Sequence, residues 1–258
     1  MKKDKKEKPK MYIASCSFGK DSIATILLAL EHNEPLDRVV FSEVMFDHEK
    51  NISGEIPEHI EWVYKVAIPK LESMGVKVDV VRAKESISSL SKKVYRTGKR
   101  KGNMRGLPSG KFCWANGALK IKAVRDYCKE LSKEKNIIHY IGIAIDEPKR
   151  LKRFDTQKVS LLTKYGYTEE MAMAKCVEYG LVSPLYSMGY RGGCWFCYNA
   201  NIERYIHIRE NHNYLWENLR SLYIESNTKV FKYGKTLQEV EKEMDAYELN
   251  EKLQLRLF

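Results

Sequence analysis

Apolar residues along the chain alternate between short strand-like runs and segments of helical periodicity. The runs that predict strands are residues 11–17, 38–46, 76–81 and 139–145. The segments that predict amphipathic helices are residues 21–32, 57–74 and 116–133. Strands alternating with helices of this length favour a parallel sheet covered on both faces. We therefore expect an α/β fold with a doubly wound, mostly parallel, Rossmann-like sheet.

The alternation weakens after about residue 149. Residues 168–179 predict a helix with Thr168 as N-cap and Gly180 as its stop, and residues 202–224 predict one long aromatic-rich helix. The aromatic side chains of that helix are expected in the core. We predict three parts: a disordered basic tail over 1–10, an α/β domain over 11–165, and a helical C-terminal subregion over 166–258.

Composition places the chain among ordinary globular proteins, with 43% hydrophobic and 31% charged residues. No apolar run approaches the roughly 20 residues that cross a bilayer, and the lysine-rich start lacks the apolar stretch of a signal peptide. We therefore expect a cytoplasmic protein without a membrane partner.

The net charge of +11 is concentrated in two segments, residues 2–10 and the segment from Lys92 to Lys111. The second contains eight cations, no acid and four glycines, which is too much glycine for a stable helix and too much charge for a core strand. We interpret it as a mobile lid over an anionic ligand, with a solvated loop as the alternative. Nucleic acid is a possible partner, because phosphate backbones attract such clusters.

The turn between the first predicted strand and helix, Ser15 to Ser22, has the features of a phosphate site. Unpaired N–H groups and the helix dipole favour an anion at a helix start. Gly19 permits a tight turn, Lys20 adds a charge, and Ser17 and Ser22 offer hydroxyls. The spacing matches neither a P-loop nor a dinucleotide fingerprint. From spacing alone, an ordinary strand–helix turn with Asp21 as a first-turn acid is an equal alternative.

The sequence Ser17-Phe18-Gly19-Lys20-Asp21-Ser22 resembles the pyrophosphate-binding loop of the adenine nucleotide alpha-hydrolase superfamily, the PP-loop ATP pyrophosphatases. The Phe18 form is similar to the branch that contains phosphoadenosine phosphosulfate (PAPS) reductases and DndC-like DNA phosphorothioation proteins. The resemblance implies a doubly wound sheet whose first loop holds nucleotide phosphates. The nucleotide-binding residues that it implies are Ser15, Ser17, Phe18, Gly19, Lys20, Asp21, Ser22, Gly142 and Arg153.

Three further segments resemble the family. Phe46-Asp47 followed by Glu55-Ile56-Pro57-Glu58 is similar to its acidic strand end, which lies near the nucleotide and Mg²⁺. The segment that begins at Gly142 and leads to Arg150 and Arg153 is similar to its glycine-led strand and basic substrate segment. Lys111-Phe112-Cys113 followed by Leu119-Lys120-Ile121 is similar to its Cys…Leu-Lys-Ile segment. The resemblance implies catalytic roles for Lys20, Asp21, Asp47 and Arg150.

Gly192-Gly193-Cys194-Trp195-Phe196-Cys197 contains a C-x-x-C pair that can chelate one metal ion. In related PAPS reductase-like proteins, some with a [4Fe–4S] cluster, cysteines at the positions of Cys113 and Cys176 accompany this pair. Both are alternatively core thiols, the role we expect for Cys16 and Cys128. His207 and His212 are substitute ligands, although lone histidines on an aromatic helix are usually structural. Ligand identity leaves zinc and iron–sulfur open.

Three functions compete at this point. The first is ATP-dependent activation that releases pyrophosphate and is coupled to sulfur transfer, with a sulfur donor protein as a possible partner and one open iron if only Cys113, Cys194 and Cys197 bind. The second is reduction of a sulfonucleotide such as PAPS or adenosine phosphosulfate. PAPS reductases use a C-terminal cysteine nucleophile, and no cysteine follows Cys197. The third is a non-catalytic, zinc-stabilised nucleic-acid-binding protein. The loop and the cysteines together favour the first.

Overall fold

The computed structural model describes residues 8–109, 113–152 and 155–254. The chain divides into two compact units built from interleaved segments. Unit 1 contains residues 1–43, 58–82 and 121–192, and unit 2 contains residues 44–57, 83–120 and 193–258. Unit 1 thus continues past the predicted boundary at residue 165. The predicted disordered tail, residues 1–10, lies outside the described residues except at positions 8–10. Within the described residues, no helix is long and apolar enough to cross a bilayer.

Unit 1 is organised around a five-stranded sheet in the order β5-β2-β1-β6-β7, in which every neighbouring pair is parallel. The strands are β1 (Lys10–Cys16), β2 (Arg38–Ser42), β5 (Val78–Val81), β6 (Asn136–Tyr140) and β7 (Lys158–Val159). After β1, the strands β2 and β5 are added on one side of β1, and the later strands β6 and β7 are added on its other side. The expected doubly wound parallel sheet is confirmed.

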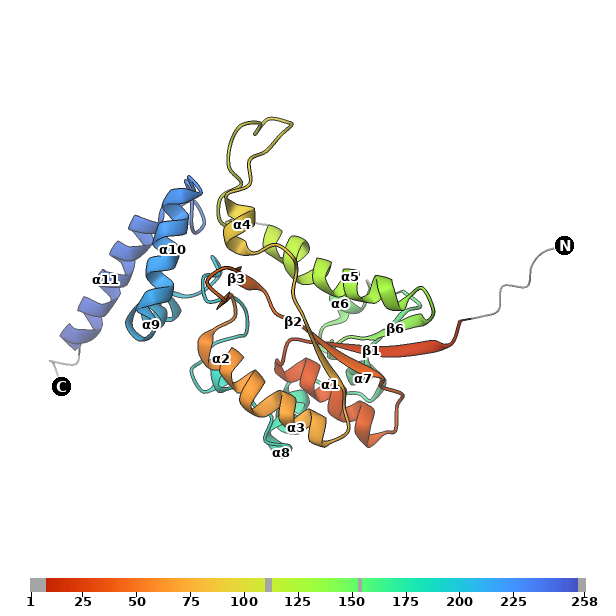
Figure 1. Cartoon of the computed structure of the whole chain (residues 1–258). Coiled ribbons are helices and arrows are strands. Elements are labelled where there is room, and N and C mark those ends of the chain that lie inside the picture. The colour runs from red at the N-terminus through yellow and green to blue at the C-terminus, as the bar shows by residue number, and fades with distance from the viewer. Residues whose placement is uncertain (1–7, 110–112, 153–154, 255–258) are drawn as a thin grey trace. The chain divides into compact units, whose positions relative to one another are not determined.

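Both faces of the unit 1 sheet are covered by helices (Figure 1). Alternate residues of β1 point to opposite faces: Ile13 packs toward α5 (Lys122–Leu131), and Ala14 packs toward α1 (Lys20–Glu31). The larger core, on the α1 side, also receives α3 (Ile68–Ser73), α7 (Leu161–Lys164) and α8 (Glu169–Glu178). This burial explains why the β1 and α1 sequences are the most continuously apolar in the chain.

Several predicted boundaries in unit 1 need adjustment. The predicted helix 57–74 forms as α2 (Pro57–Trp62), a π-helical turn η1 (Val63–Ala67) and α3, because Pro69 supplies no N–H to the preceding turn. The predicted helix 116–133 begins with the π-helical turn η2 (Asn116–Ile121) and continues as α5. Thr168 caps α8 by accepting from the N–H of Met171, and Gly180 has φ 58°, so both predicted ends of that helix are confirmed. The short helix α6 (Pro148–Leu151) follows β6.

The predicted strand 139–145 is wrong in position, because β6 ends at Tyr140. After Ile141 the chain passes over the start of α1. A Cβ atom on Gly142 would lie 2.7 Å from the carbonyl carbon of Asp21. This close passage turns the chain away from the sheet before residue 145.

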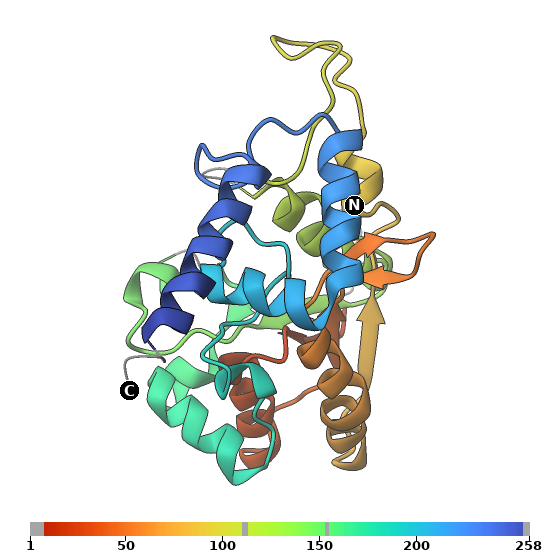
Figure 2. The same ribbon diagram turned by 90° about the vertical axis from the view of Figure 1, so that its left-hand side faces the viewer.

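Unit 2 contains a small antiparallel pair and a group of helices. The pair is β3 (Met45–Asp47) with β4 (Ile52–Ser53), so the predicted strand 38–46 is divided between the two units. Helices α10 (Asn213–Glu225) and α11 (Leu237–Gln254) both contact α9 (Ile202–Asn211) (Figure 2). The predicted single helix 202–224 is wrong. It breaks at His212, where φ is −135° and Asn211 caps the carbonyl of His207.

The basic segment follows α4 (Ile87–Ser91) and forms a hairpin-like arm, which we define as residues 92–106 (Figures 1 and 2). The N–H of Tyr95 donates to the carbonyl of Asn103, and the N–H of Arg105 donates to the carbonyl of Lys93, both at 2.9 Å. At the base, the N–H of Leu107 donates to Thr228 Oγ1 at 2.9 Å. The arm is therefore an ordered two-stranded feature of unit 2.

Candidate functional site: a phosphate loop and a cysteine group

The turn from β1 to α1 leaves two backbone donors free at the start of a helix. Gly19 is the N-cap of α1 and makes no side-chain cap bond. In the described part of the chain, no group accepts from the N–H of Gly19 or the N–H of Asp21. Such donors at the positive end of a 12-residue helix form a site for an anion. The turn also lies at the carboxyl edge of the sheet, beside the point where the strand order reverses, and ligands of open α/β sheets bind there.

The turn is fixed by contacts that the sequence pattern does not reveal. Phe18 has φ 56°, a left-handed conformation that is costly for a bulky residue. Its ring is fully buried and meets Phe41 edge to face at 5.2 Å between centroids. Phe18 therefore contributes backbone to the turn, while its side chain belongs to the core.

A buried histidine, His59, contacts the backbone of the turn at Ser17. His59 Nε2 lies 3.1 Å from the carbonyl oxygen of Ser17, and its Nδ1 lies 2.9 Å from Ser183 Oγ. His59 and Ser183 are each 2% exposed. With the Nε2 proton donated to Ser17 and Nδ1 accepting from Ser183, the chain orients the Ser17 carbonyl into the protein. The sequence analysis missed both residues, since neither lies near the loop in the chain.

Ser22 has a different role from the one we expected. Its hydroxyl accepts from the N–H of Ser17 at 3.3 Å and lies 2.9 Å from the carbonyl of Gly19, to which it donates. The side chain is nearly buried, so Ser22 closes the turn internally. Ser17 is exposed, and its hydroxyl remains the one placed for a ligand.

Lys20 sits between two carboxylates at the mouth of the turn. Its Nζ lies 2.8 Å from Asp21 and 2.9 Å from Glu169, and its backbone N–H donates to Tyr186 Oη. Burial lowers the pKa of Lys20, but the bonds and charges of the two carboxylates outweigh it and leave that pKa above its ordinary value. Burial raises the pKa of Asp21, against the lowering effect of Lys20. Glu169 and Tyr186 are loop partners that the sequence analysis missed.

The other predicted unit 1 residues take separate positions. Arg150 lies on α6 and makes a two-oxygen ion pair with Glu147 at 2.6 and 2.7 Å. Arg153 lies outside the described residues. Ser15 lies near the end of β1, and Gly142 passes over the start of α1. Cys176 is buried in the larger core, and its Sγ donates to the carbonyl of Lys20 at 3.3 Å; burial raises its pKa to about 12.

Replacing Gly142 with alanine should destabilise unit 1 and lower nucleotide affinity together. The added methyl would lie under 3 Å from three backbone atoms of Asp21 and Ser22, which cannot move without shifting the turn. Overpacking of this kind costs about 1–3 kcal/mol. Thermal unfolding and nucleotide titration measure the two effects. Gly192→Ala is the control, because nothing lies within 4 Å of a Cβ at that position. Equal stability of the two variants would refute the steric argument.

Unit 2 holds the other predicted ligands, Cys113, Cys194 and Cys197. The pKa of Cys194 is raised well above its ordinary value, first by burial and then by Glu55, with Cys197 and Cys113 adding to the effect. The backbones of Glu55 and Cys194 form an isolated antiparallel bridge, which fixes the C-x-x-C start against residues after β4. Among the described residues, the three sulfurs do not all lie within 4.8 Å of one another.

An ion pair between a buried carboxylate and a partly buried lysine lies beside these cysteines. Glu55 is 3% exposed, and Lys120 Nζ lies 3.6 Å from its Oε1, an oxygen with no hydrogen-bond partner among the described residues. The charge of Glu55 raises the pKa of Lys120 against burial, and Cys194 and Cys113 add to this effect. Thiols are the donor type of zinc and iron–sulfur centres, but these sulfurs are not gathered as in a formed zinc site, so a metal role for the three cysteines stays a prediction.

Asp47, the predicted Mg²⁺ residue, ends β3 in unit 2. Its Oδ1 accepts from the N–H groups of Glu49 and Lys50 at 2.9 and 3.1 Å. Burial raises the pKa of Asp47, but these bonds and one from Ser88 outweigh it, so the pKa lies below its ordinary value. The carboxylate is thus ionised and closes a turn, and its role toward Mg²⁺ stays a prediction.

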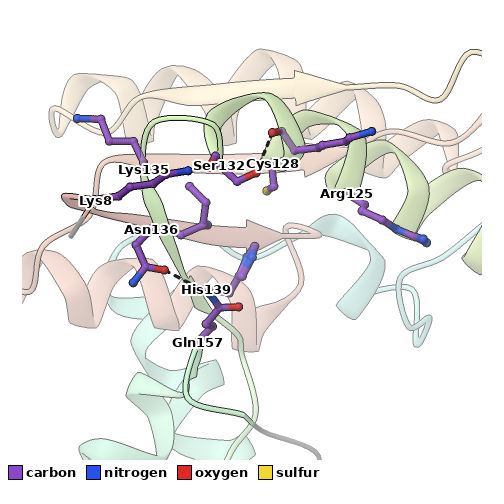
Figure 3. Close-up of a pocket in the computed structure, with 10 residues that line it drawn as sticks. Lys8, Arg125, Cys128, Ser132, Lys135, Asn136, His139 and Gln157 are labelled. Carbon is purple, nitrogen blue, oxygen red and sulfur yellow. Dashed lines mark hydrogen bonds between the residues drawn. The ribbon is translucent and has the colours of Figure 1, made fainter. Parts of the chain in front are cut away.

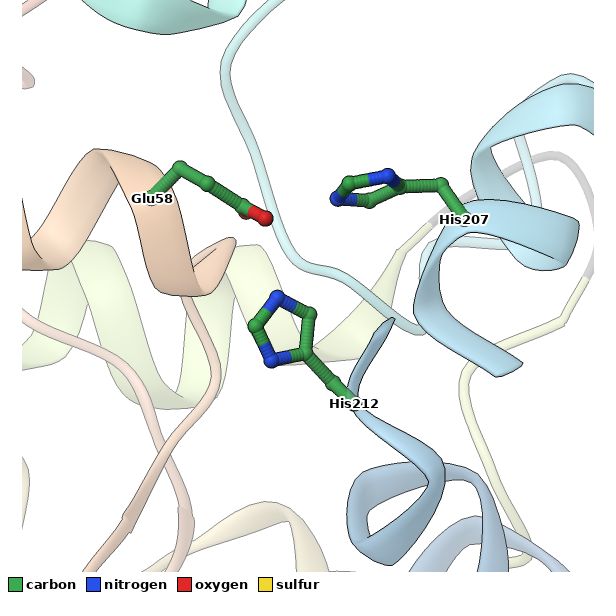
Figure 4. A group of neighbouring side chains, drawn as sticks. All are labelled: Glu58, His207 and His212. Atoms are coloured by element: carbon green, nitrogen blue, oxygen red, sulfur yellow. The ribbon is translucent and has the colours of Figure 1, made fainter. Parts of the chain in front are cut away.

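The two candidate histidine ligands lie at the end of α9. The rings of His207 and His212 meet edge to face at 5.8 Å between centroids (Figure 4). Glu58, drawn with them, belongs to α2 of unit 1. A metal role for His207 or His212 stays a prediction.

Comparisons with known proteins give little further information. No protein-family model matches the chain, and no curated protein matches it significantly. Among solved structures, it is similar to the U34-tRNA thiolase NcsA from Methanococcus maripaludis with its [4Fe–4S] cluster, at 12% identity and a TM-score of 0.42, over 92% of this chain and 73% of that one. A likeness this weak assigns neither a family nor an activity to the chain.

Proposed function

We propose that this chain is a PAPS reductase-like, adenine-nucleotide-binding enzyme of the ATP pyrophosphatase type, which activates an acceptor with ATP and then transfers sulfur to it. The observation that carries the proposal is the anion site of unit 1, where the free N–H groups of Gly19 and Asp21 stand beside Lys20 at the carboxyl edge of the sheet. The sequence of this loop resembles those that hold pyrophosphate.

The chemistry of activation needs positioning and charge neutralisation. An acceptor oxygen attacks the α-phosphorus of ATP and loses its proton; the bond from that phosphorus to the bridging oxygen breaks, and pyrophosphate leaves. The two N–H groups and Lys20 bind the departing pyrophosphate, and Arg150 exchanges Glu147 for a phosphate oxygen. Asp47 is assigned to Mg²⁺. In the second step a sulfur nucleophile from a donor protein displaces AMP from the adenylated acceptor.

Cys113, Cys194 and Cys197 would hold a [4Fe–4S] cluster or Zn²⁺ in unit 2. A cluster with three protein ligands keeps one iron available to external sulfur. The chain's own contribution there is charge: Lys120, paired with Glu55, lies near the thiols and offsets the negative charge of the thiolates.

The acceptor class that the arm supports is nucleic acid. Arg96, Lys99 and Lys101 make no ion pair with any described residue, and Arg100 lies over the Tyr95 ring at 5.9 Å. Arg105 lies over the Trp114 ring at 4.8 Å. Unpaired cations beside the partly buried rings of Tyr95, on the arm, and Trp114, after it, are suited to a phosphate backbone.

The proposal is tested by anaerobic purification with metal analysis and an absorbance spectrum, followed by ATP–pyrophosphate exchange. We expect exchange that requires Mg²⁺, and sulfur incorporation into an added nucleic acid when a sulfur donor is supplied. A colourless zinc protein without exchange would instead support the nucleic-acid-binding alternative. Release of sulfite from PAPS would support the sulfonucleotide reductase.

A further inference from the structure

A second cationic feature lies in unit 1, between the end of α5 and the start of β6. It is a hollow of about 630 Å³, which we call the α5–β6 hollow (Figure 3). Lys8, Arg125, Lys129 and Lys135 line it, together with His139 and Ser132, and none of the described residues that line it is a carboxylate. Ligand pockets of this size are mostly apolar. The composition of this one instead favours an anion that carries several charges.

Its cations make no ion pair among the described residues, in contrast to neighbouring lysines on α5 and just after it. Within the described residues, Arg125, Lys129 and Lys135 make no ion pair, and all three are exposed. Lys122 and Lys133, by contrast, pair with Asp126 and Glu130. The lysines that form ion pairs with α5 carboxylates therefore lie outside the hollow, and the cations that line it make no ion pair within the described residues.

Among the described residues, Lys8 is held by a backbone carbonyl and by no acid. Its Nζ donates to the carbonyl oxygen of Ser132 at 2.7 Å, which keeps the ammonium at the C-terminal end of α5. The amide of Gln157 donates to Asn136 Oδ1 at 3.3 Å on the other wall. The hollow thus has fixed polar groups as well as mobile cations.

The spacing of the cations suits a repeating anion better than a single one. Arg125 and Lys135 lie at opposite ends of the hollow (Figure 3). The α5 wall from Arg125 to Ser132 spans about 10 Å, at 1.5 Å per helical residue. Phosphates recur at regular intervals along a nucleic-acid strand, so a wall of this length can face more than one of them.

The hollow lies at the opposite edge of the sheet from the phosphate loop. Lys8 precedes β1 and Asn136 begins β6, whereas the loop follows the last residue of β1. Seven residues of strand separate the two edges by about 20 Å. A nucleotide in the loop cannot reach the hollow, so its ligand is a separate one.

We propose that the α5–β6 hollow binds consecutive phosphates of a nucleic-acid backbone. This site takes no part in the proposed nucleotide chemistry, and the proposal does not depend on that chemistry. Its side chains supply charge and no base-reading geometry, so binding there is independent of sequence.

The test is salt-dependent binding of a fluorescent single-stranded RNA to the full chain carrying Arg125→Gln, Lys129→Gln and Lys135→Gln. Losing three phosphate contacts should reduce the slope of log affinity against log salt by about 2 and weaken binding about 10- to 100-fold at 0.1 M salt. The matched control replaces Lys65, Lys122 and Lys133 with glutamine. It removes the same net charge from unit 1, but from lysines that pair with Glu61, Asp126 and Glu130.

Four outcomes decide the matter. A reduced slope in the triple variant, with the control and ATP–pyrophosphate exchange unchanged, supports the site. Equal loss in variant and control overturns it, because net charge alone would then explain binding. Competition of inorganic tripolyphosphate with the RNA at equal phosphate concentration also overturns it, in favour of a small polyphosphate ligand. An arm variant, Arg96→Gln with Lys99→Gln and Lys101→Gln, measures the contribution of the arm to the salt dependence of RNA binding. If the arm alone accounts for the slope of log affinity against log salt, the proposed site in the hollow is overturned.

Discussion

Replacing Lys20 with methionine is expected to lower ATP–pyrophosphate exchange about 100-fold or more and to weaken nucleotide binding in parallel. The Nζ of Lys20 holds Asp21 and Glu169 at 2.8 and 2.9 Å. Without this cation, two carboxylates stand uncompensated beside the free N–H groups of the turn and repel the phosphates that these groups attract. Removal of one preorganised charge contact costs about 10²–10³ in rate in other enzymes.

Two further variants make this prediction specific. Lys164→Met removes a lysine that pairs with Glu34 elsewhere in unit 1, and it should leave exchange and affinity unchanged. Glu169→Gln removes a carboxylate that competes with the nucleotide phosphates for Lys20, and it leaves the positive charge of Lys20 in place. This variant should preserve or increase nucleotide affinity. Thermal unfolding of each variant separates loss of binding from loss of folding. Normal exchange in folded Lys20→Met would exclude the loop as the pyrophosphate site.

Replacing Cys194 with alanine is expected to abolish metal binding by the chain and to lower the thermal stability of unit 2. This thiol is partly buried, its backbone is fixed against Glu55, and it lies near the partly buried Lys120. Metal bound by thiolates contributes several kcal/mol of folding free energy, because the unfolded chain has no preformed site. Elemental analysis and thermal unfolding before and after chelation measure both effects.

Two cysteine controls identify the ligand set. Cys128→Ala on α5 should retain the metal. Cys176→Ala should also retain it, since this thiol is buried in the core of unit 1 and donates to the carbonyl of Lys20. Loss of metal from Cys176→Ala would restore Cys176 as the fourth ligand. Because Cys194→Ala can unfold unit 2, Cys113→Ala, at a position without the backbone bridge to Glu55, gives a second measurement, and retained metal in both would refute the site.

Local sequence patterns predicted the sheet, most of the helices that cover it and the position of the phosphate loop. Apolar runs fixed β1 and α1 because both are buried almost throughout, so every residue had to agree with the core. The ends of α8 were predictable for a similar reason: Thr168 and Gly180 each satisfy a requirement of the helix itself. Where a local rule determines the backbone conformation, a single sequence is enough to predict the element.

The misses depend on contacts between distant residues. His59, Glu169 and Tyr186 reach the loop from later parts of the chain, and no spacing rule relates them to Ser17 or Lys20. The break at His212 interrupts an otherwise helical pattern and depends on the Asn211 cap. The early end of β6 depends on how closely Gly142 passes Asp21, which is a tertiary restriction.

The buried ring of Phe18 has a consequence for the dynamics of the phosphate loop. A glycine at this position would let the turn open by itself, whereas Phe18 ties the turn to Phe41 in the middle of the sheet. Opening of the turn then requires disruption of the core, so the hydrogen-bonded amides of Ser17 and Phe18 should exchange with solvent only as rapidly as unit 1 unfolds globally, unlike the free N–H groups of Gly19 and Asp21. A ligand meets a loop that is already ordered and gives up little conformational entropy on binding.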